Sequence, residues 1–126
     1  MNSTVIYTEN APAPIGPYSQ ARRVGNQLFV SGQIPLNPKT GELVMDSIES
    51  QTEQVMKNLS AVLEAAGAEF SHVIRTTIFL KSMDDFPKVN EIYGRYFSEP
   101  FPARACVEVA RLPKNVSVEI DCIAFL

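Results

Sequence analysis

Two stretches of the chain repeat their hydrophobic residues with the period of an α-helix. In the first, one apolar stripe runs from Ile48 to Ala66, which predicts an amphipathic helix because residues three and four apart share a helical face. Asp46 fits the N-cap of this helix, Glu49 follows three residues later, and Gly67 fits the C-terminal stop. The stripe consists of Ile48, Val55, Met56, Leu59, Val62, Leu63 and Ala66.

The second helical stretch follows a run of strand-like residues. It is predicted to start near Asp84, with Pro87 tolerated in its first turn, and the segment SEPFP at 98–102 ends it. Its buried stripe comprises Phe86, Val89, Tyr93, Tyr96 and Phe97.

The remaining hydrophobic segments favour β-strands, because apolar and polar residues alternate in them or β-branched residues dominate. Gly25 and Asn26 form a hairpin turn between the second and third strands. A proline-rich stretch at 10–20 predicts an extended arm. The order β-β-β-α-β-α-β-β predicts a single domain over residues 1–126, with an α+β fold (or a mixed α/β sandwich). The six strand candidates are 3–8, 19–25, 27–34, 72–81, 102–113 and 116–125.

Two of these strands are apolar on both faces. In 72–81, Ile74, Ile78 and Leu80 alternate with Val73 and Phe79, and such a strand requires cover on both sides. The two helices can cover only one face, so we expect a second copy of the chain to cover the other. The alternative is that the N-terminal arm folds over the sheet, which would cover less area. The last strand shows the same pattern, with Val118, Ile120 and Cys122 against Ile123 and Phe125.

Composition narrows the classes of function. The net charge is −3 and the basic residues form no stripe, which argues against a protein that binds nucleic-acid duplexes. We expect no membrane partner and a cytoplasmic location, since no apolar run could span a bilayer and no signal peptide is apparent. Cys106 and Cys122 are expected to be free thiols. A single histidine and no Cys-x-x-Cys motif predict no metal site.

The segment PARACVEVARLP at 102–113 places an unusual set of side chains on one strand. Arg104, Cys106 and Glu108 share one face, opposite Ala103, Ala105, Val107 and Val109. A guanidinium can bind a substrate carboxylate through two parallel hydrogen bonds. The alternative is an ordinary ion pair of Arg104 with Glu108 or Glu119. A nucleophilic role for Cys106 has no support, since no base lies near it in the sequence.

Four blocks of the sequence, in order, resemble one protein family. They are IGPYSQ at 15–20, FVSGQIPLNPKTGEL at 29–43, VNEIYGRYF at 89–97 and FPARACVEVARLPKNVSVEI at 101–120. From these motifs the chain is identified as a member of the reactive intermediate deaminase family, also called RidA or YjgF. The resemblance runs over nearly the whole chain, although Asp121 and Cys122 stand where Glu and Ala are frequent in the family.

The resemblance implies a chorismate-mutase-like fold with a six-stranded mixed sheet, assembled as a homotrimer with a central β-barrel and the helices outside. The sequence pattern alone favours a hairpin of the last two strands. The resemblance instead places the last strand inside the sheet, beside the strand that follows the first helix. It also implies active sites in clefts between subunits.

The resemblance further implies a cofactor-independent hydrolase. Its substrates are enamine and imine intermediates released by pyridoxal-phosphate enzymes, such as 2-aminoacrylate (2-iminopropanoate) and 2-iminobutanoate. The products are 2-keto acids and ammonia.

Carried over position by position, the resemblance assigns eight site residues. Arg104 is the carboxylate anchor, and Glu119 holds or deprotonates the attacking water. Tyr18 reaches the cleft from the neighbouring subunit and hydrogen-bonds the substrate. Glu108 and Asp121 are interpreted as solvated or paired strand residues. The other assigned positions are Cys106 in the catalytic set, largely through its backbone, and Ser31, Gly32, Asn90 and Ala103 for substrate binding.

Two other functions remain open from the sequence. The same arginine would serve a non-catalytic module that binds small keto acids, although an intact Glu119 favours catalysis. An RNA-acting inhibitor of translation is the third hypothesis, against which the acidic balance of the chain counts.

Overall fold

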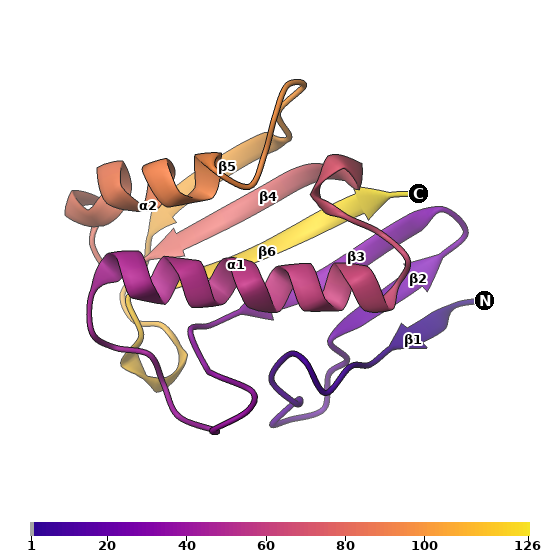
Figure 1. Cartoon of the computed structure of the whole chain (residues 1–126), viewed down its shortest axis with the longest axis horizontal. Helices are drawn as coiled ribbons and strands as arrows, with labels where there is room; N and C mark the ends of the chain where they lie inside the picture. Colours follow the sequence, from indigo (N-terminus) through magenta and orange to yellow (C-terminus); the bar gives the residue numbers. More distant parts are fainter. Residues whose placement is uncertain (1) are drawn as a thin grey trace.

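Strands and helices follow one another along the chain in the predicted order. The computed structural model describes residues 2–126, and all six strands and both helices lie within that range (Figure 1). Short 3₁₀ turns precede β4, α2 and β6. The elements are β1 Thr4–Ile6, β2 Ala21–Val24, β3 Gln27–Gln33, α1 Ile48–Ala65, β4 Val73–Leu80, α2 Phe86–Gly94, β5 Ala103–Glu108 and β6 Val118–Phe125.

The last strand of the chain lies in the interior of the sheet. β6 pairs antiparallel with β3 on one side and with β4 on the other, and β5 pairs parallel with β4 at the edge. The strand order is therefore β1-β2-β3-β6-β4-β5, with the yellow β6 between β3 and β4 in Figure 1. The prediction of a hairpin between the last two strands is wrong, because β5 and β6 do not pair. The prediction of a mixed sheet with the last strand inserted is confirmed. The parallel pair β4–β5 is possible because α2 forms the crossover between them.

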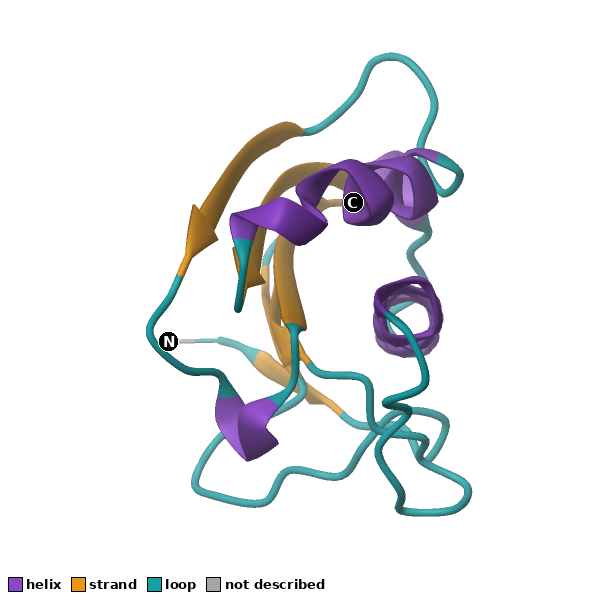
Figure 2. Ribbon diagram, turned by 90° about the vertical axis from the view of Figure 1, so that its left-hand side faces the viewer, coloured by secondary structure: helices purple, strands orange, loops and turns teal. Residues whose placement is uncertain are grey.

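Both helices pack on the same face of the sheet (Figures 1 and 2). Side chains of the α1 stripe meet the inward-facing side chains of β4 and β6, and together they form one hydrophobic core. Each fully buried aliphatic side chain contributes about 1.5–3 kcal/mol relative to an exposed one. The largest fully buried apolar side chains include Leu28, Met56, Leu59, Leu63, Ile78, Leu80 and Ile120.

The first helix begins one residue later than the sequence predicts. Ser47 is its N-cap, and the Ser47 hydroxyl accepts a hydrogen bond from the Ser50 amide at 3.0 Å. The prediction of Asp46 as the N-cap is wrong. Either side chain could accept such a bond, and only the backbone path selects Ser47. Gly67 follows the helix at φ +76, a left-handed conformation that glycine adopts without strain.

The second helix is shorter than its hydrophobic stripe. A 3₁₀ turn at Met83–Asp85 precedes it, and α2 begins at Phe86, so Pro87 lies in the first turn as predicted. Val89 and Tyr93 are buried, whereas Tyr96 and Phe97 lie beyond the end of the helix and pack beside the core.

A β-bulge at the start of β4 changes which residues face the helices. The pairing of β4 with β6 shifts register between Val73 and Arg75. Val73 is therefore buried and Ile74 is half exposed, the reverse of what strict alternation with Ile78 and Leu80 predicts. Beyond the bulge the alternation holds.

The face of the sheet opposite the helices retains exposed apolar side chains. Phe29, Val107 and Phe125 are 42%, 42% and 48% exposed. The N-terminal arm does not cover them. The buried Gln20 side chain fixes the arm by donating hydrogen bonds to the carbonyls of Thr8 and Pro12. The expectation that a second copy covers this face remains a prediction.

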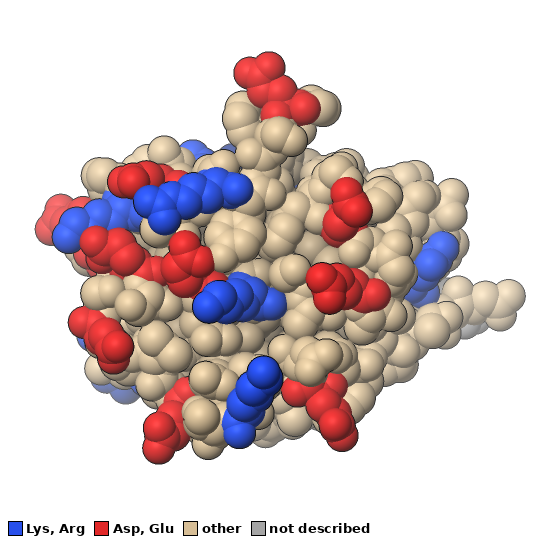
Figure 3. Space-filling model, viewed as in Figure 1, with Lys and Arg blue, Asp and Glu red and all other residues tan. Residues whose placement is uncertain are grey.

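Lys and Arg are interspersed with Asp and Glu on the side of the molecule shown in Figure 3, which carries the two helices. Among residues 2–126, neither helix has the length and the apolar character needed to cross a membrane.

Candidate active site

Arg104 stands on the edge strand β5, on the side of the sheet that carries the helices. Its neighbour across the parallel pair is the buried Thr76, so the strand register directs the guanidinium toward α2. There it donates a hydrogen bond to the amide oxygen of Asn90 at 2.7 Å. The guanidinium carbon lies 5.4 Å from the centre of the Phe86 ring and 5.1 Å from that of Tyr93.

The Arg104 side chain borders an open pocket, which we call the arginine half-site. No ion pair of Arg104 with Glu108 or Glu119 forms, since both ion pairs within residues 2–126 involve Arg95. Glu108 instead accepts a hydrogen bond from the Met83 amide. The guanidinium thus remains available to an anionic ligand. The lining residues are Asn90, Tyr93, Gly94, Phe101, Pro102 and Arg104.

Cys106 lies two residues further along β5 and shares the Arg104 face. Its thiol is free and half-buried. Burial raises the pKa of the Cys106 thiol, and the nearby positive charge of Arg104 offsets only part of that effect. The group is therefore held as a thiol rather than a thiolate, which agrees with the prediction that it is not a nucleophile.

Glu119 belongs to a second pocket, on the open face of the sheet, which we call the glutamate half-site. It lies on β6 beside Gly32 of β3, and a Cβ atom built on Gly32 would lie only 2.9 Å from the Glu119 carboxylate carbon. The absence of a side chain at Gly32 is what gives this carboxylate its place against the strand. The lining residues are Ile15, Tyr18, Ser31, Gly32, Ile34, Pro113 and Glu119.

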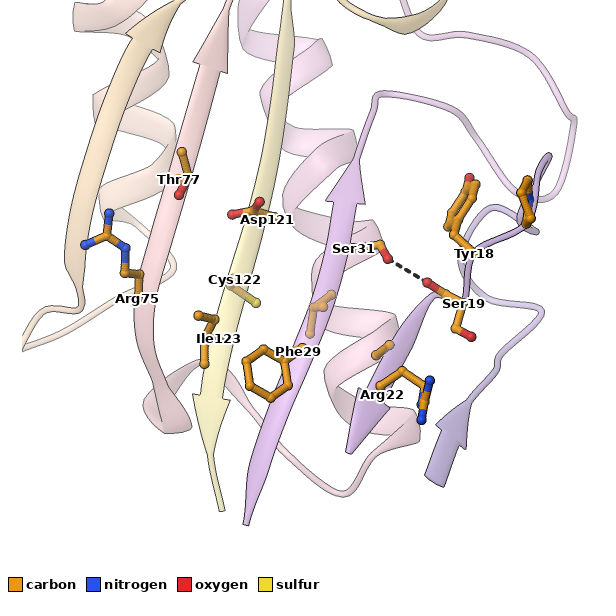
Figure 4. A pocket seen from close by; sticks show the side chains of 13 residues that line it. Tyr18, Ser19, Arg22, Phe29, Ser31, Arg75, Thr77, Asp121, Cys122 and Ile123 are labelled. Carbon is orange, nitrogen blue, oxygen red and sulfur yellow. Dashed lines mark hydrogen bonds between the residues drawn. The ribbon is translucent and has the colours of Figure 1, made fainter. Parts of the chain in front are cut away.

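The pKa of Glu119 is raised above its ordinary range. The main cause is burial of the carboxyl group, and the negative charge of Asp121 adds to it. Asp121 lies two residues along β6 on the same face, as the alternation predicts, and Figure 4 shows its side chain beside Thr77 and Arg75. A carboxylate with a raised pKa is a better base for a water molecule than an ordinary one.

Ser31 and Tyr18 occupy the same half-site as Glu119. The Ser31 hydroxyl donates to the Ser19 carbonyl at 2.6 Å (Figure 4), and the Ser31 amide donates to the Gln20 carbonyl. Both donors of Ser31 are thus engaged within the chain, so its hydroxyl faces a ligand as an acceptor. The Tyr18 side chain is 51% exposed and lies at the rim.

The two half-sites face opposite sides of one sheet. Arg104 pairs with Thr76 and Thr76 with Cys122, whose side chain is buried beneath the helices. Glu119 pairs with Phe79 and points to the other face. Within one chain, therefore, Arg104, Cys106 and Asn90 lie together, as do Tyr18, Ser31, Gly32 and Glu119. Ala103 alternates with Arg104 and so lies on the open face.

The sequence pattern does not mark two aromatic residues near Arg104 as site residues. It predicts Phe86 and Tyr93 only as core residues of the second helix. The available signal was their spacing with Asn90, because positions 86, 90 and 93 share one helical face. Phe101, also in the arginine half-site, lies in a loop without any periodic signal.

Comparisons with known proteins agree with this architecture. A family model described as endoribonuclease L-PSP matches residues 8–126. A RutC family protein from Pyrococcus horikoshii is 59% identical over 121 residues, which are 96% of each chain. The protein named Reactive Intermediate Deaminase A, chloroplastic, from Arabidopsis thaliana is 52% identical over 97% of this chain and 65% of its own length.

Solved structures show the same fold. The YjgF gene product from E. coli superposes with a TM-score of 0.92 at 49% identity, covering 97% of this chain and 98% of that one. RidA from an Antarctic Psychrobacter species superposes with a TM-score of 0.94 at 43% identity, covering 98% and 99% of the two chains.

Proposed function

The chain belongs to the endoribonuclease L-PSP family, which includes the YjgF and RidA proteins, and we propose that it is a deaminase of reactive enamine and imine intermediates. The proposed substrates are 2-iminopropanoate, formed from 2-aminoacrylate, and 2-iminobutanoate. Pyridoxal-phosphate enzymes release such intermediates, and their hydrolysis gives 2-keto acids and ammonia. One relative at 52% identity carries the name of a reactive intermediate deaminase.

The observation that carries this proposal is the availability of Arg104. Its guanidinium is anchored by Asn90 and borders a pocket, yet it has no acidic partner among residues 2–126. An arginine in this state can bind a small carboxylate through paired hydrogen bonds. Each proposed substrate has a carboxylate directly beside the imine carbon.

In the proposed mechanism, Arg104 binds the substrate carboxylate and Glu119 binds a water molecule. The water oxygen attacks the carbon of the protonated imine while Glu119 accepts a proton from it. The resulting carbinolamine bears a hydroxyl and an amino group on one carbon. Glu119 returns this proton to the nitrogen, and the C–N bond then breaks as the hydroxyl gives its proton to Glu119, which releases ammonia and leaves the 2-keto acid. The raised pKa of Glu119 favours this base role at neutral pH.

We further propose that the complete site forms between two copies of the chain in a homotrimer. Arg104 and Glu119 lie on opposite faces of one sheet, so an adjacent copy must supply the second group. The exposed apolar side chains on the open face supply a surface that association would bury.

A coupled assay tests the proposed activity. Threonine dehydratase generates 2-iminobutanoate from threonine, and loss of the enamine and imine absorbance is followed with and without this protein. We expect wild type to accelerate the loss and Arg104→Ala to remove the acceleration. The matched control is Arg23→Ala, on β2, which should act like wild type. Equal rates with wild type, Arg104→Ala and buffer would overturn the deaminase.

The two alternative functions give different outcomes in related experiments. Binding of 2-oxobutanoate through Arg104 without any turnover would point to a keto-acid-binding module. An RNA-acting protein should show a shift with labelled RNA that weakens as salt rises. On the face shown in Figure 3, Lys and Arg are interspersed with Asp and Glu, which counts against an RNA-binding surface there.

A further inference from the structure

We propose that Phe86 and Tyr93 form an aromatic clamp that sets the orientation of the Arg104 guanidinium, and that Asn90 holds this arginine rather than the substrate. The inference rests on the proposed function, because it assigns the clamp to the carboxylate anchor of that site. It makes Phe86, Asn90 and Tyr93 positioning residues.

The helix α2 presents the three residues to Arg104 as one stripe. Positions 86, 90 and 93 are spaced i, i+4 and i+7, so their side chains lie above one another on one face. Both aromatic rings lie within 6 Å of the guanidinium carbon, the range of a cation–π interaction. The Asn90 oxygen accepts the Nη1 proton at 2.7 Å. Three successive contacts on one helical face thus converge on a single side chain.

The clamp is itself fixed by the sheet. The Tyr93 hydroxyl makes a buried hydrogen bond of 2.7 Å to the Thr76 hydroxyl. Thr76 pairs with Arg104 across the parallel strands β4 and β5. Of this pair of adjacent residues, Arg104 is the proposed anchor, and Thr76 fixes the Tyr93 ring that contacts it. The Tyr93 ring also packs against the Phe97 ring with centres 4.6 Å apart.

The physical role of the clamp follows from the length of the arginine side chain. A free arginine on an edge strand loses conformational freedom when it binds a ligand, and that loss weakens binding. Two rings and one amide oxygen restrict the side chain before the ligand arrives. The Asn90 bond uses only one of the five N–H groups of the guanidinium, so others remain for a carboxylate. The effect should appear in substrate binding rather than in the chemical step.

The test compares Phe86→Leu with Phe86→Trp. Phe86→Leu keeps an apolar side chain but removes the ring, and we expect KM for 2-iminobutanoate to rise about two- to fivefold with kcat unchanged. Phe86→Trp restores a ring and should restore KM. The control is Phe70→Leu, the same change at a ring that packs on Tyr96 and Phe97 and not on either ring of the clamp. It should lower the thermal midpoint and leave KM unaltered.

A second measurement does not depend on activity. In the ¹H–¹⁵N NMR spectrum, the Nε–H signal of Arg104, assigned by its loss in Arg104→Lys, should show a ring-current shift in wild type. The shift should shrink in Phe86→Leu and persist in Phe70→Leu.

The clamp would be refuted if Phe86→Leu left both KM and the Nε signal unchanged while Arg104→Ala removed activity. An equal rise of KM in Phe70→Leu would also refute it, since the effect would then come from loss of packing. If wild type shows no hydrolysis, the proposed function fails, and the Nε signal alone decides whether the clamp exists.

Discussion

At the scale of single residues, Gly32 is the position where the smallest change should have the largest effect on chemistry. A Cβ atom there would collide with a carboxylate oxygen of Glu119 and approach its carboxylate carbon to 2.9 Å. Gly32→Ala should therefore displace the proposed base. A displacement near 1 Å can cost about 100-fold in rate, so we expect kcat to fall by about ten- to 100-fold. Steady-state kinetics with 2-iminobutanoate measure it.

A double-mutant cycle is the control for this prediction. If Gly32→Ala acts through the glutamate, then adding it to Glu119→Gln should cause no further loss of kcat. Fully additive losses would show that the glycine acts independently of Glu119. Thermal unfolding of each variant checks that the fold persists.

The acidic pair on β6 predicts a pH dependence. Burial and the charge of Asp121 raise the pKa of Glu119, and a base acts only when deprotonated. Activity should therefore fall as the pH drops through this raised pKa. Asp121→Asn removes the negative charge that opposes ionisation of Glu119, so the acidic limb should move to lower pH.

The measurement is the pH profile of kcat/KM, which reports the pKa values of the essential groups in the free enzyme. Asp84→Asn, an acid in the turn before α2, is the control and should leave the limb in place. A limb that moves to higher pH in Asp121→Asn, or does not move, would contradict the assignment of Glu119 as the base.

At the scale of elements, the start of α1 depends on one hydroxyl. Ser47→Ala removes the side-chain acceptor for the Ser50 amide, and loss of such an N-cap costs about 1 kcal/mol. The free energy of unfolding from urea titration should fall by that amount. Asp46→Ala, one residue earlier, should change it by less than about 0.5 kcal/mol. The opposite ranking of the two variants would restore Asp46 as the cap.

Helices and strands could be predicted from the sequence where one period of hydrophobic residues dominates the segment. The α1 stripe from Ile48 onward and the alternation in β6 follow from burial of one face, which the sequence records directly. The bulge before Arg75 is a local insertion in one strand of a pair, so it leaves no periodic signal. The place of β6 between β3 and β4 depends on pairing between distant segments, and only the family resemblance supplied it.

The candidate site could be predicted only in part for the same reason. Period two places Arg104 and Cys106 together, and the structure agrees. Whether Glu119 faces the same side of the sheet as Arg104 depends on the pairing registers of β5 with β4 and of β4 with β6. These registers are set by tertiary structure and leave no local signal in the sequence. The ring contacts of Phe86 and Tyr93 with Arg104 likewise depend on how α2 lies on the sheet.

At the scale of the whole molecule, neither half-site contains every group that the proposed hydrolysis requires. The arginine half-site has a guanidinium for a carboxylate but no base, and the glutamate half-site has the proposed base on the opposite face of the sheet. Closed rings of identical subunits bring one surface of each copy against a different surface of the next. Such contacts can join an arginine half-site to a glutamate half-site at every interface.

This arrangement predicts complementation between two impaired variants. Arg104→Ala and Glu119→Gln should each show only a small residual activity alone. When they are mixed at equal concentrations and refolded together, an active interface needs an intact Arg104 from one copy and an intact Glu119 from the next. Random assembly supplies both at about one quarter of the interfaces, so the mixture should regain about a quarter of wild-type activity. Arg104→Ala mixed with Arg104→Lys should gain nothing beyond what the lysine variant shows alone, because both lesions lie in one half-site. If native mass spectrometry shows mixed oligomers and activity stays at the level of the single variants, the site is not shared between copies.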